Sequence, residues 1–222
     1  MLALKRNRRS QFLLLSMFSA FLCLGKTVWA APTLSAGSAS GQAGTTVNLQ
    51  MNFDPTSASV AGMQFNVTVP AGLSTGTVTG GAILTSAVKS VNTNLIGNTW
   101  TFIIFGINQT AIPSGPLLTA QMRIGAGVSN GTLSLPISNV VYTDPSGQPV
   151  TSGTTTGGSV TVYSACDLDL DGSATAPDVQ LVVNQALGVT SCTADLNKDS
   201  RCDVIDVQRV VNAVLGGACV TP

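Results

Sequence analysis

The sequence predicts a mainly β protein, in which an antiparallel β-sandwich over residues 31–163 is followed by a small helical module over residues 164–222. Three observations support this prediction. Apolar and polar residues alternate in short runs through the first segment, the second segment contains an acidic motif that begins at Asp167 and again at Asp195, and a basic and apolar leader precedes both. Alternation of period two is typical of half-buried strands, whereas an internal repeat indicates two copies of one supersecondary unit.

Residues 1–30 have the three parts of a secretory signal peptide. Basic residues from Lys5 to Arg9 precede the apolar run Phe12–Leu24 and the small-residue site that ends at Ala30. The apolar run is shorter than the ~20 residues needed to cross a bilayer, which makes a retained membrane anchor the weaker interpretation. We therefore expect cleavage after Ala30, export by the general or the twin-arginine route, no membrane span in the mature chain, and a secreted, extracellular protein.

The composition argues against several functions. The chain has no His and no Glu, so the usual general base, the commonest zinc ligand and a glutamate pair for glycoside hydrolysis are missing. Residues 31–163 hold two acidic and two basic side chains, and residues 164–222 hold eight Asp against three basic side chains, a net charge of −5. Neither part would attract a phosphate backbone. We expect no enzymatic activity and no nucleic-acid partner.

Alternating runs place apolar side chains on one face of several predicted strands. The four clearest faces are Val47, Leu49, Met51 and Phe53; Met63, Phe65, Val67 and Val69; Trp100, Phe102 and Ile104; and Leu118, Ala120, Met122 and Ile124. Shorter candidate strands are Ala82–Val88, Thr132–Leu135, Val140–Thr143 and Ser159–Tyr163. Many short strands separated by Gly, Pro, Asn and Ser predict an antiparallel sandwich or barrel.

The predicted sandwich carries little chemistry of its own. Asp54 and Asp144 each precede a proline, a pairing that favours turns, and no second titrating group accompanies either. Exposed aromatic side chains would let the sheet bind a polysaccharide, and Trp100 is the main candidate for that role. Its position in an apolar strand favours the core instead. Carbohydrate binding by the sandwich face is therefore kept as the alternative function.

The acidic motif forms two loops, 167–178 and 195–206. Aligned on their first residues, Asp167–Gly188 and Asp195–Gly216 are identical at 11 of 22 positions. Candidate oxygen ligands fall at positions 1, 3, 5, 7 and 12 of both loops, with position 7 contributing its backbone carbonyl. They are Asp167, Asp169, Asp171, Ser173 and Asp178 in the first loop, and Asp195, Asn197, Asp199, Arg201 and Asp206 in the second.

This spacing matches the coordination chemistry of calcium. Ca²⁺ takes six to eight oxygen ligands, and a coiled loop turns alternate side chains toward one centre. Gly172 suits the sharp bend at position 6, where the second loop has Ser200 instead, a residue expected to strain the turn. Two bound ions would change the net charge of residues 164–222 from −5 to −1. The sequence therefore predicts two Ca²⁺ ions in EF-hand-like loops.

A helix is expected after each loop. Apolar residues recur at spacings of three and four over residues 179–187 and 207–215, and a glycine follows each run. The residues before the first loop are expected to form a strand, so each unit lacks the first helix of an ordinary EF-hand. Helices of this length are marginal alone, so metal ions and disulfides are expected to stabilise them.

The cysteines agree with an exported chain. Four remain after removal of the leader, and all lie in the acidic segment: Cys166, Cys192, Cys202 and Cys219. An even number in an exported protein predicts two disulfides, for which three pairings exist. The number and spacing of the cysteines leave all three open.

Residues 165–220 resemble a type I dockerin, with two loop–helix repeats, Asp at position 12 and Gly after each helix. Residues 33–163 resemble, more loosely, a cohesin or a related carbohydrate-binding-module-like jelly roll, through Gly44–Leu49 and Gly62–Val67. The resemblance implies calcium-dependent binding between cohesin and dockerin modules and assembly of extracellular polysaccharide-degrading complexes. The expected partner is a cohesin or dockerin module, or a second copy of the chain, because both kinds of module lie in one sequence.

Two features depart from well-known dockerins. Ala176-Pro177 and Val204-Ile205 occupy loop positions 10 and 11, where those dockerins carry a Ser-Thr pair that recognises the partner. The cysteines are additions as well, because none has a cysteine at the equivalent place in the other repeat. Antiparallel repeats should bring the ends of the segment together. We therefore expect Cys166–Cys219 as a clasp and Cys192–Cys202 as a link between the helix connection and the second loop.

These observations predict a secreted, non-catalytic calcium-binding protein that mediates protein–protein assembly or anchoring, of the cohesin and dockerin type. Such assembly would take place within extracellular polysaccharide-degrading systems. A protein that binds carbohydrate through its β-sandwich face is the alternative.

Overall fold

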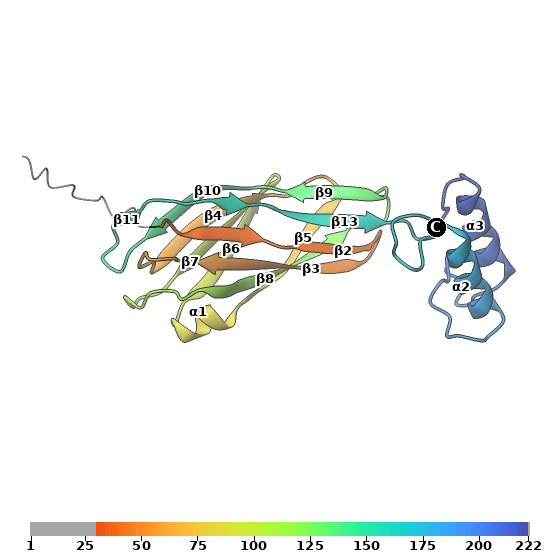
Figure 1. The fold of residues 1–222 in the computed structure, drawn as a ribbon, viewed down its shortest axis with the longest axis horizontal. Coiled ribbons are helices and arrows are strands. Elements are labelled where there is room, and N and C mark those ends of the chain that lie inside the picture. The colour runs from red at the N-terminus through yellow and green to blue at the C-terminus, as the bar shows by residue number, and fades with distance from the viewer. Residues whose placement is uncertain (1–29, 222) are drawn as a thin grey trace, which may run out of the picture.

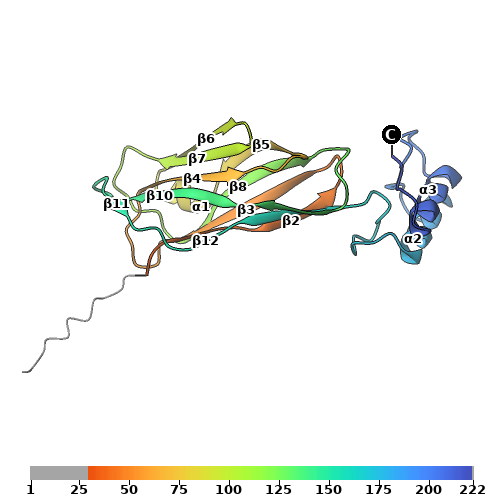
Figure 2. The same cartoon turned by 90° about the horizontal axis from the view of Figure 1, so that it is seen from above.

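The computed structural model describes residues 30–221. Strands from Thr33 to Tyr163 form an elongated sandwich, and two helices pack together beyond one end of it (Figures 1 and 2). The predicted signal peptide, apart from Ala30, lies outside the described residues. Within residues 30–221, no helix combines the length and the apolar character that crossing a membrane would require.

The first layer of the sandwich is a five-stranded sheet in the order β12-β1-β3-β8-β5. Its strands are β1 (Thr33–Ala36), β3 (Thr46–Asp54), β5 (Leu73–Gly80), β8 (Gly115–Ile124) and β12 (Thr155–Thr156). The pairs β1–β3, β3–β8 and β5–β8 are antiparallel, whereas β12 lies parallel to β1.

The second layer is an antiparallel sheet in the order β11-β10-β4-β7-β6. Its strands are β4 (Gly62–Thr68), β6 (Ser90–Ile96), β7 (Thr99–Phe105), β10 (Ile137–Thr143) and β11 (Pro149–Val150). A three-stranded sheet, β2 (Ser38–Gln42), β13 (Gly158–Tyr163) and β9 (Gly131–Leu135), completes the body, with β13 parallel to β2 and antiparallel to β9. The mainly antiparallel sandwich predicted from the sequence is confirmed.

The core lies between the two layers. Every apolar residue that the sequence assigns to the four clearest strand faces is buried there. Phe65 and Phe102 stack with ring centroids 4.9 Å apart, and Trp100 is 2% exposed. Trp100 is therefore a core residue, as its place in an apolar strand predicts. Burial of these alternating side chains supplies the main driving force for folding of the sandwich.

The strand predicted over residues 82–88 is wrong, because Ala82–Ser86 form the short helix α1. The buried residues of this segment are Ile83, Leu84 and Ala87, which is the spacing of a helix and not of a strand. An apolar run this short fits both a strand and a helix, so the length of the run could not decide between the two. Alternation of apolar residues predicted none of the strands β1, β2, β5, β6, β11 and β12, and the Ser, Thr, Gly and Asn content of the first four is common in turns.

The C-terminal region contains the helices α2 (Ala176–Ala186) and α3 (Val204–Val214), each preceded by one acidic loop. Both begin three residues before the apolar runs that predict them. Thr175 and Asp203 are the N-caps, and Asp178 and Asp206 close a capping box at each helix. The two helices pack around a small apolar core of their own.

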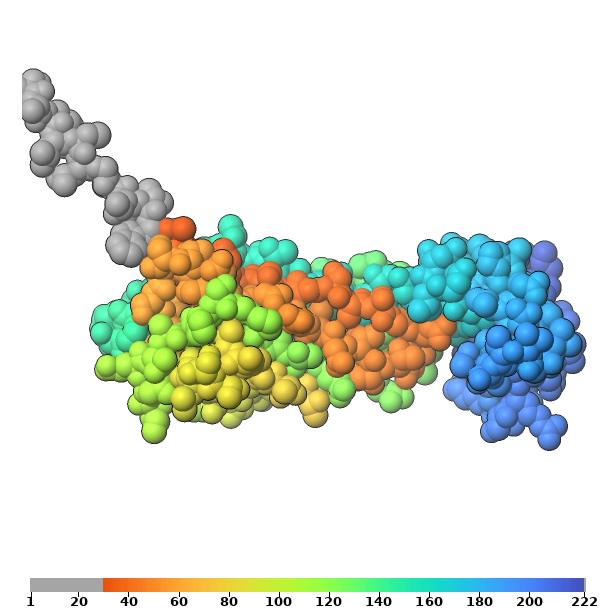
Figure 3. Space-filling view, turned by 60° about the horizontal axis from the view of Figure 1, so that its bottom comes forward, coloured from red at the N-terminus to blue at the C-terminus, as the bar shows by residue number. Residues whose placement is uncertain are grey.

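The connection between the sandwich and this region is short. β13 ends at Tyr163, and Nε2 of Gln42 on β2 donates to the carbonyl oxygens of Ser164 at 3.4 Å and Asp167 at 3.1 Å. Figure 3 shows the C-terminal residues, in blue, beyond the end of the sandwich. The strand β11 lies at the opposite end of the molecule (Figures 1 and 2).

Candidate functional site

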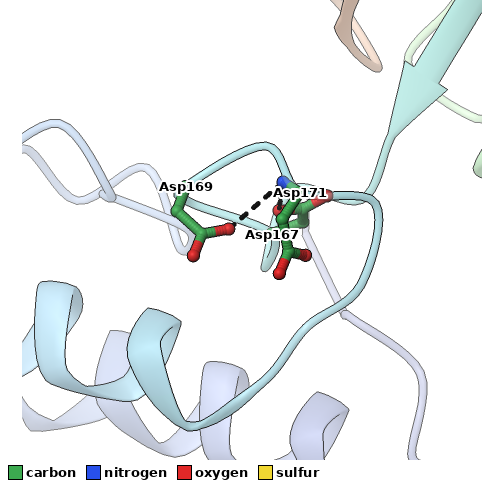
Figure 4. A group of neighbouring side chains, drawn as sticks. All are labelled: Asp167, Asp169 and Asp171. Carbon is green, nitrogen blue, oxygen red and sulfur yellow. Dashed lines mark hydrogen bonds between the residues drawn. The ribbon is translucent and has the colours of Figure 1, made fainter.

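Three carboxylates converge in the loop that precedes α2. Asp167, Asp169 and Asp171 each bring an oxygen to within 4.8 Å of the others (Figure 4). Asp167 is buried, whereas Asp169 and Asp171 are exposed to solvent. Like charges this close repel each other, and the repulsion is strongest at the buried member. The cluster is therefore the part of the described chain with the most to gain from a bound cation.

Backbone N–H groups of the loop orient the three side chains. Asp167 accepts the N–H of Asp171 on Oδ1 at 3.1 Å and the N–H of Gly172 on Oδ2 at 2.9 Å. Oδ1 of Asp169 accepts the N–H of Asp171 at 3.2 Å, and Oδ1 of Asp171 accepts the N–H of Ser173 at 3.0 Å. The chain thus coils around the carboxylates at positions 1, 3 and 5, which holds them in place.

Asp178, at position 12, has a different place in the loop. Its Oδ1 accepts the N–H groups of Leu168 at 2.6 Å and Asp169 at 3.1 Å, and its Oδ2 accepts that of Thr175 at 2.7 Å. The side chain is fully buried, and it lies outside the group of three converging carboxylates. Asp178 therefore joins the start of the loop to the first turn of α2.

The second loop repeats these hydrogen bonds at the equivalent positions. Asp195 accepts the N–H groups of Asp199 and Ser200, and Asn197 accepts that of Asp199. Asp199 accepts the N–H group of Arg201. Asp206 accepts the N–H groups of Leu196, Asn197 and Asp203. Position 4 is left-handed in both loops, with φ of 62° at Leu170 and 60° at Lys198. The repeat seen in the sequence therefore extends to the conformation of the backbone.

Two substitutions distinguish the second loop. Asn197 stands where the first loop has Asp169, and its Nδ2 donates to Oδ2 of Asp199 at 2.8 Å. For this reason the second loop contributes no group of three carboxylates within the described residues. Position 6 is left-handed in both loops, with φ of 105° at Gly172 and 72° at Ser200. That region favours glycine, so the serine carries a conformational cost.

The two buried carboxyl groups of the first loop have opposite pKa shifts. Burial raises the pKa of Asp167, and the charges of Asp178 and Asp171 raise it further. Hydrogen bonds from the loop backbone lower this pKa, but the net result is a pKa above the ordinary value. Burial also raises the pKa of Asp178, but hydrogen bonds from Thr175 and the loop backbone outweigh burial and leave it lowered. A cation beside Asp167 would favour its ionised form.

The donor set fits a hard divalent cation. Positions 1, 3 and 5 offer carboxylate oxygens, or one amide oxygen in the second loop, and Ca²⁺ prefers such oxygens. The clustered carboxylates of the first loop are close enough to share one ion. Ser173 and Arg201, the candidates for carbonyl ligation at position 7, are held by N–H bonds to Asp171 and Asp199.

Two disulfides brace the C-terminal region. Cys166 and Cys219 are joined with an S–S distance of 2.03 Å, and Cys192 and Cys202 with one of 1.93 Å. These are the two pairs expected from antiparallel repeats. The first joins the residue before the first loop to the segment after α3. The second joins the connection after α2 to position 8 of the second loop.

A second candidate site, missed by sequence analysis, lies on the outer face of the β11-β10-β4-β7-β6 sheet. Ile103, Phe105 and Val141 are 43%, 49% and 50% exposed. Val141 pairs with Gln64, and Gln64 pairs with Ile103, so these residues form a row across β10, β4 and β7. They line a groove of about 450 Å³. Exposed apolar side chains gathered in one groove are typical of a recognition surface.

The sequence carries a signal for this groove. Residues 102–105 read Phe-Ile-Ile-Phe, which breaks the alternation of apolar and polar residues along β7 and places apolar side chains on both faces of the strand. The carbohydrate alternative gains no support from the described residues, because Trp100 and Tyr142 are buried in the core and Tyr163 is half-buried.

Fold and groove together define the class of protein, a β-sandwich with an exposed apolar groove and an appended pair of helices. The family model of the cohesin domain matches residues 32–162, more than half of the sequence. The chain belongs to the cohesin family. Residues 163–222 lie outside the match. No curated protein matches the chain.

Solved structures show the same fold. A non-cellulosomal cohesin from the archaeon Archaeoglobus fulgidus is 18% identical, with a TM-score of 0.51 over 60% of this chain and 92% of that one. The seventh ScaB type I cohesin from Pseudobacteroides cellulosolvens is 16% identical, with a TM-score of 0.53 over 61% and 94%. A type I cohesin–dockerin complex from Clostridium thermocellum contains a chain 14% identical, with a TM-score of 0.53 over 61% and 95%.

Proposed function

We propose that this protein is a secreted, non-catalytic assembly factor whose cohesin sandwich binds a protein partner and whose C-terminal module binds two Ca²⁺ ions. The observation that carries the proposal is the apolar groove of Ile103, Phe105 and Val141 on the outer sheet face. A partner that covered it would remove these side chains from water, which is the main source of affinity in such interfaces. Among solved structures of the same fold are type I cohesin–dockerin complexes.

Calcium binding is supported by the matched loops. The first ion would be held by Asp167, Asp169, Asp171, Asp178 and the carbonyl of Ser173, and the second by Asp195, Asn197, Asp199, Asp206 and the carbonyl of Arg201. The ions supply positive charge to a segment of net charge −5. Neutralising this repulsion stabilises the folded loops, so calcium acts on folding and, through folding, on the position of α2 and α3.

The proposed partner is a second copy of this chain. Apolar side chains are exposed at the ends of α2 and α3, among them Leu187, Val204 and Leu215. The groove includes Asp144, Pro145 and Gly147, next to β11, whereas the helices lie at the opposite end of the sandwich (Figure 1). The short connection and the Gln42 hydrogen bonds hold the helices there. The helices of one copy therefore reach the groove of another copy and not their own, a head-to-tail contact that extends into chains.

Calcium dependence of the tail is tested with the mature chain, residues 31–222. Chelation with EDTA is expected to melt residues 165–219 and to leave the sandwich intact, which circular dichroism and limited proteolysis report separately. The tail should then be cut while residues 31–163 survive. Identical spectra and identical digestion with and without EDTA, or no heat on titration with calcium, would contradict the proposed role of the ion.

Head-to-tail association is tested by combining two variants. The wild-type chain should form species of increasing mass with concentration in calcium, measured by light scattering after size exclusion. Ile103→Asp in the groove and the double variant Leu187→Ser/Leu215→Ser on the helices should each be monomeric. Their mixture should give a dimer that cannot grow, since one intact groove and one intact tail remain. Ile96→Asp, an exposed position outside the groove, is the matched control.

A wild-type chain that stays monomeric in calcium at about 100 μM would exclude a second copy as a partner of useful affinity. A different cohesin or dockerin module, or an extracellular polysaccharide-degrading complex that carries one, would then be the partner to test against the same Ile103→Asp variant. Export is tested independently, because the N-terminus of the secreted protein is expected at Ala31.

A further inference from the structure

The Cys192–Cys202 disulfide is attached to only one of the two acidic loops, although the backbone N–H hydrogen bonds of the loops match. We propose that this disulfide pre-positions the second loop for Ca²⁺ and thereby offsets the weaker ligand set of that loop. The two cysteines are positioning residues in this role, because their sulfur atoms are bonded to each other and would not contact the ion. The inference rests on the proposed calcium function.

The two loops share their pattern of backbone hydrogen bonds. Seven N–H to side-chain oxygen hydrogen bonds of the first loop recur at the equivalent positions of the second, and both loops lead into a helix with a capping box. Eight of the twelve loop positions differ in side chain, among them position 9, where the first loop has Thr175 and the second has Asp203, the N-cap of α3. A difference in affinity between the loops must therefore come from these positions.

Two of these positions weaken the second loop. Asn197 replaces a carboxylate at position 3, which removes one negative charge from the ligand set. Ser200 holds a φ of 72° at position 6, where the first loop has Gly172. A non-glycine residue in the left-handed region lowers the population of the binding conformation before any ion arrives. Without a further constraint, the second loop is expected to bind calcium less tightly than the first.

The disulfide supplies such a constraint at the part of the loop that needs it. Cys202 lies between Arg201, whose carbonyl is the candidate ligand at position 7, and Asp203, the N-cap of α3. Cys192 lies shortly before Asp195, the first ligand of the same loop. The bridge therefore ties the middle of the loop to the segment that enters it, with a sequence separation of 10. Ala174 occupies the place of Cys202 in the first loop.

A side chain of α2 anchors the other end of this brace. Oε1 of Gln185 accepts the N–H groups of Thr193 at 2.7 Å and Ala194 at 2.8 Å, and it lies 3.5 Å from Sγ of Cys202. The entering segment is thus fixed to α2 before the loop begins. A ligand set that is ordered in advance loses less conformational entropy on binding, which raises its affinity without adding a contact to the ion.

The test measures each site by itself in the full mature chain. Asp171→Ala silences the first loop and Asp199→Ala the second; both change exposed residues at the equivalent position 5. In each background, calcium titration calorimetry compares the intact chain with Cys192→Ser/Cys202→Ser. Loss of the bridge should weaken the second site by about ten-fold and leave the first site within about two-fold.

A compensating variant separates positioning from general stability. Adding Ser200→Gly to Cys192→Ser/Cys202→Ser should recover most of the lost affinity of the second site, because glycine populates the left-handed region freely. Far-ultraviolet circular dichroism in saturating calcium checks that the helices are formed in every variant.

Equal weakening of both sites, or an unchanged second site, would overturn the inference while leaving the calcium function in place. Absence of binding in the wild-type chain would overturn both. If Cys192→Ser/Cys202→Ser does not fold even in calcium, the calcium affinity of Ser200→Gly with the disulfide intact tests the inference instead. Since the disulfide already orders the loop, that variant should tighten the second site by less than about two-fold, and a gain of about ten-fold or more would contradict the inference.

Discussion

Oδ1 of Asp178 accepts the backbone N–H of Leu168 at 2.6 Å, across the whole of the first loop. The same contact recurs in the second loop between Asp206 and Leu196, at 2.8 Å. Both carboxylates are fully buried and both close a capping box, so each one links the entrance of its loop to the first turn of its helix. The last residue of each predicted ligand set is therefore also the residue that organises the loop.

Replacing Asp178 should destabilise the C-terminal module even without calcium. Asp178→Ala leaves the N–H groups of Leu168, Asp169 and Thr175 without their acceptor, and the loss of these three partly buried hydrogen bonds to a carboxylate should cost about 3 kcal/mol in total. Urea unfolding in EDTA, followed by the helical circular dichroism signal, measures the loss. Asp171→Ala is the control and should lose far less, because Asp171 is exposed and accepts one N–H, that of Ser173 in the same loop.

Acid should unfold the metal-free module through the same residue. The pKa of Asp178 is lowered in the folded chain, so its ionised form contributes stability that is fully present above the unfolded pKa of about 3.9. This contribution to stability is lost as the pH falls from the unfolded pKa through the lowered pKa of Asp178 in the folded chain. Melting temperatures measured in EDTA from neutral to strongly acidic pH should show this loss of stability. In Asp178→Asn the melting temperature should depend less on pH. An equal acid dependence in the variant would contradict this assignment.

Tyr142 should make the sandwich sensitive to alkali. Its hydroxyl is buried without a hydrogen-bond partner in the described structure, and burial raises its pKa to about 12. Because the unfolded phenol ionises near pH 10, stability should fall as the pH rises from about 10 toward 12. Tyr142→Phe should remove this loss and stabilise the sandwich by about 1 kcal/mol at neutral pH, since no unsatisfied hydroxyl remains.

Ultraviolet absorbance reports ionisation of the phenol, and thermal unfolding reports stability. Tyr163→Phe is the control, because Tyr163 is half-buried and lies at the end of β13. A Tyr142→Phe variant that is less stable than the wild type would show that the hydroxyl has a partner, such as a buried water molecule.

The two disulfides should contribute unequally to the module. Cys166–Cys219 closes a sequence separation of 53 and Cys192–Cys202 one of 10, so loop-closure entropy predicts losses of about 4 and about 3 kcal/mol. The serine double variants, unfolded in urea at saturating calcium, give the comparison. A larger loss from the shorter bridge would show that its effect lies in the folded loop and not in the unfolded chain.

The sequence by itself determined the features that depend on local chemistry. Period-two alternation identified the inner faces of β3, β4, β7 and β8, and the repeated acidic spacing identified the residues that line both loops. Residues whose neighbours along the chain already specify their conformation can be predicted in this way.

Only the tertiary structure decided what depends on register between distant segments. It placed Val141, Gln64 and Ile103 in one row across three strands, which creates an apolar groove that no single strand reveals. It turned residues 82–86 into a helix because Ile83 and Leu84 both reach the core. It also decided which of the three cysteine pairings forms, a choice that the spacing of the cysteines in the sequence leaves open. Long-range packing, which sequence periodicity does not encode, determines each of these.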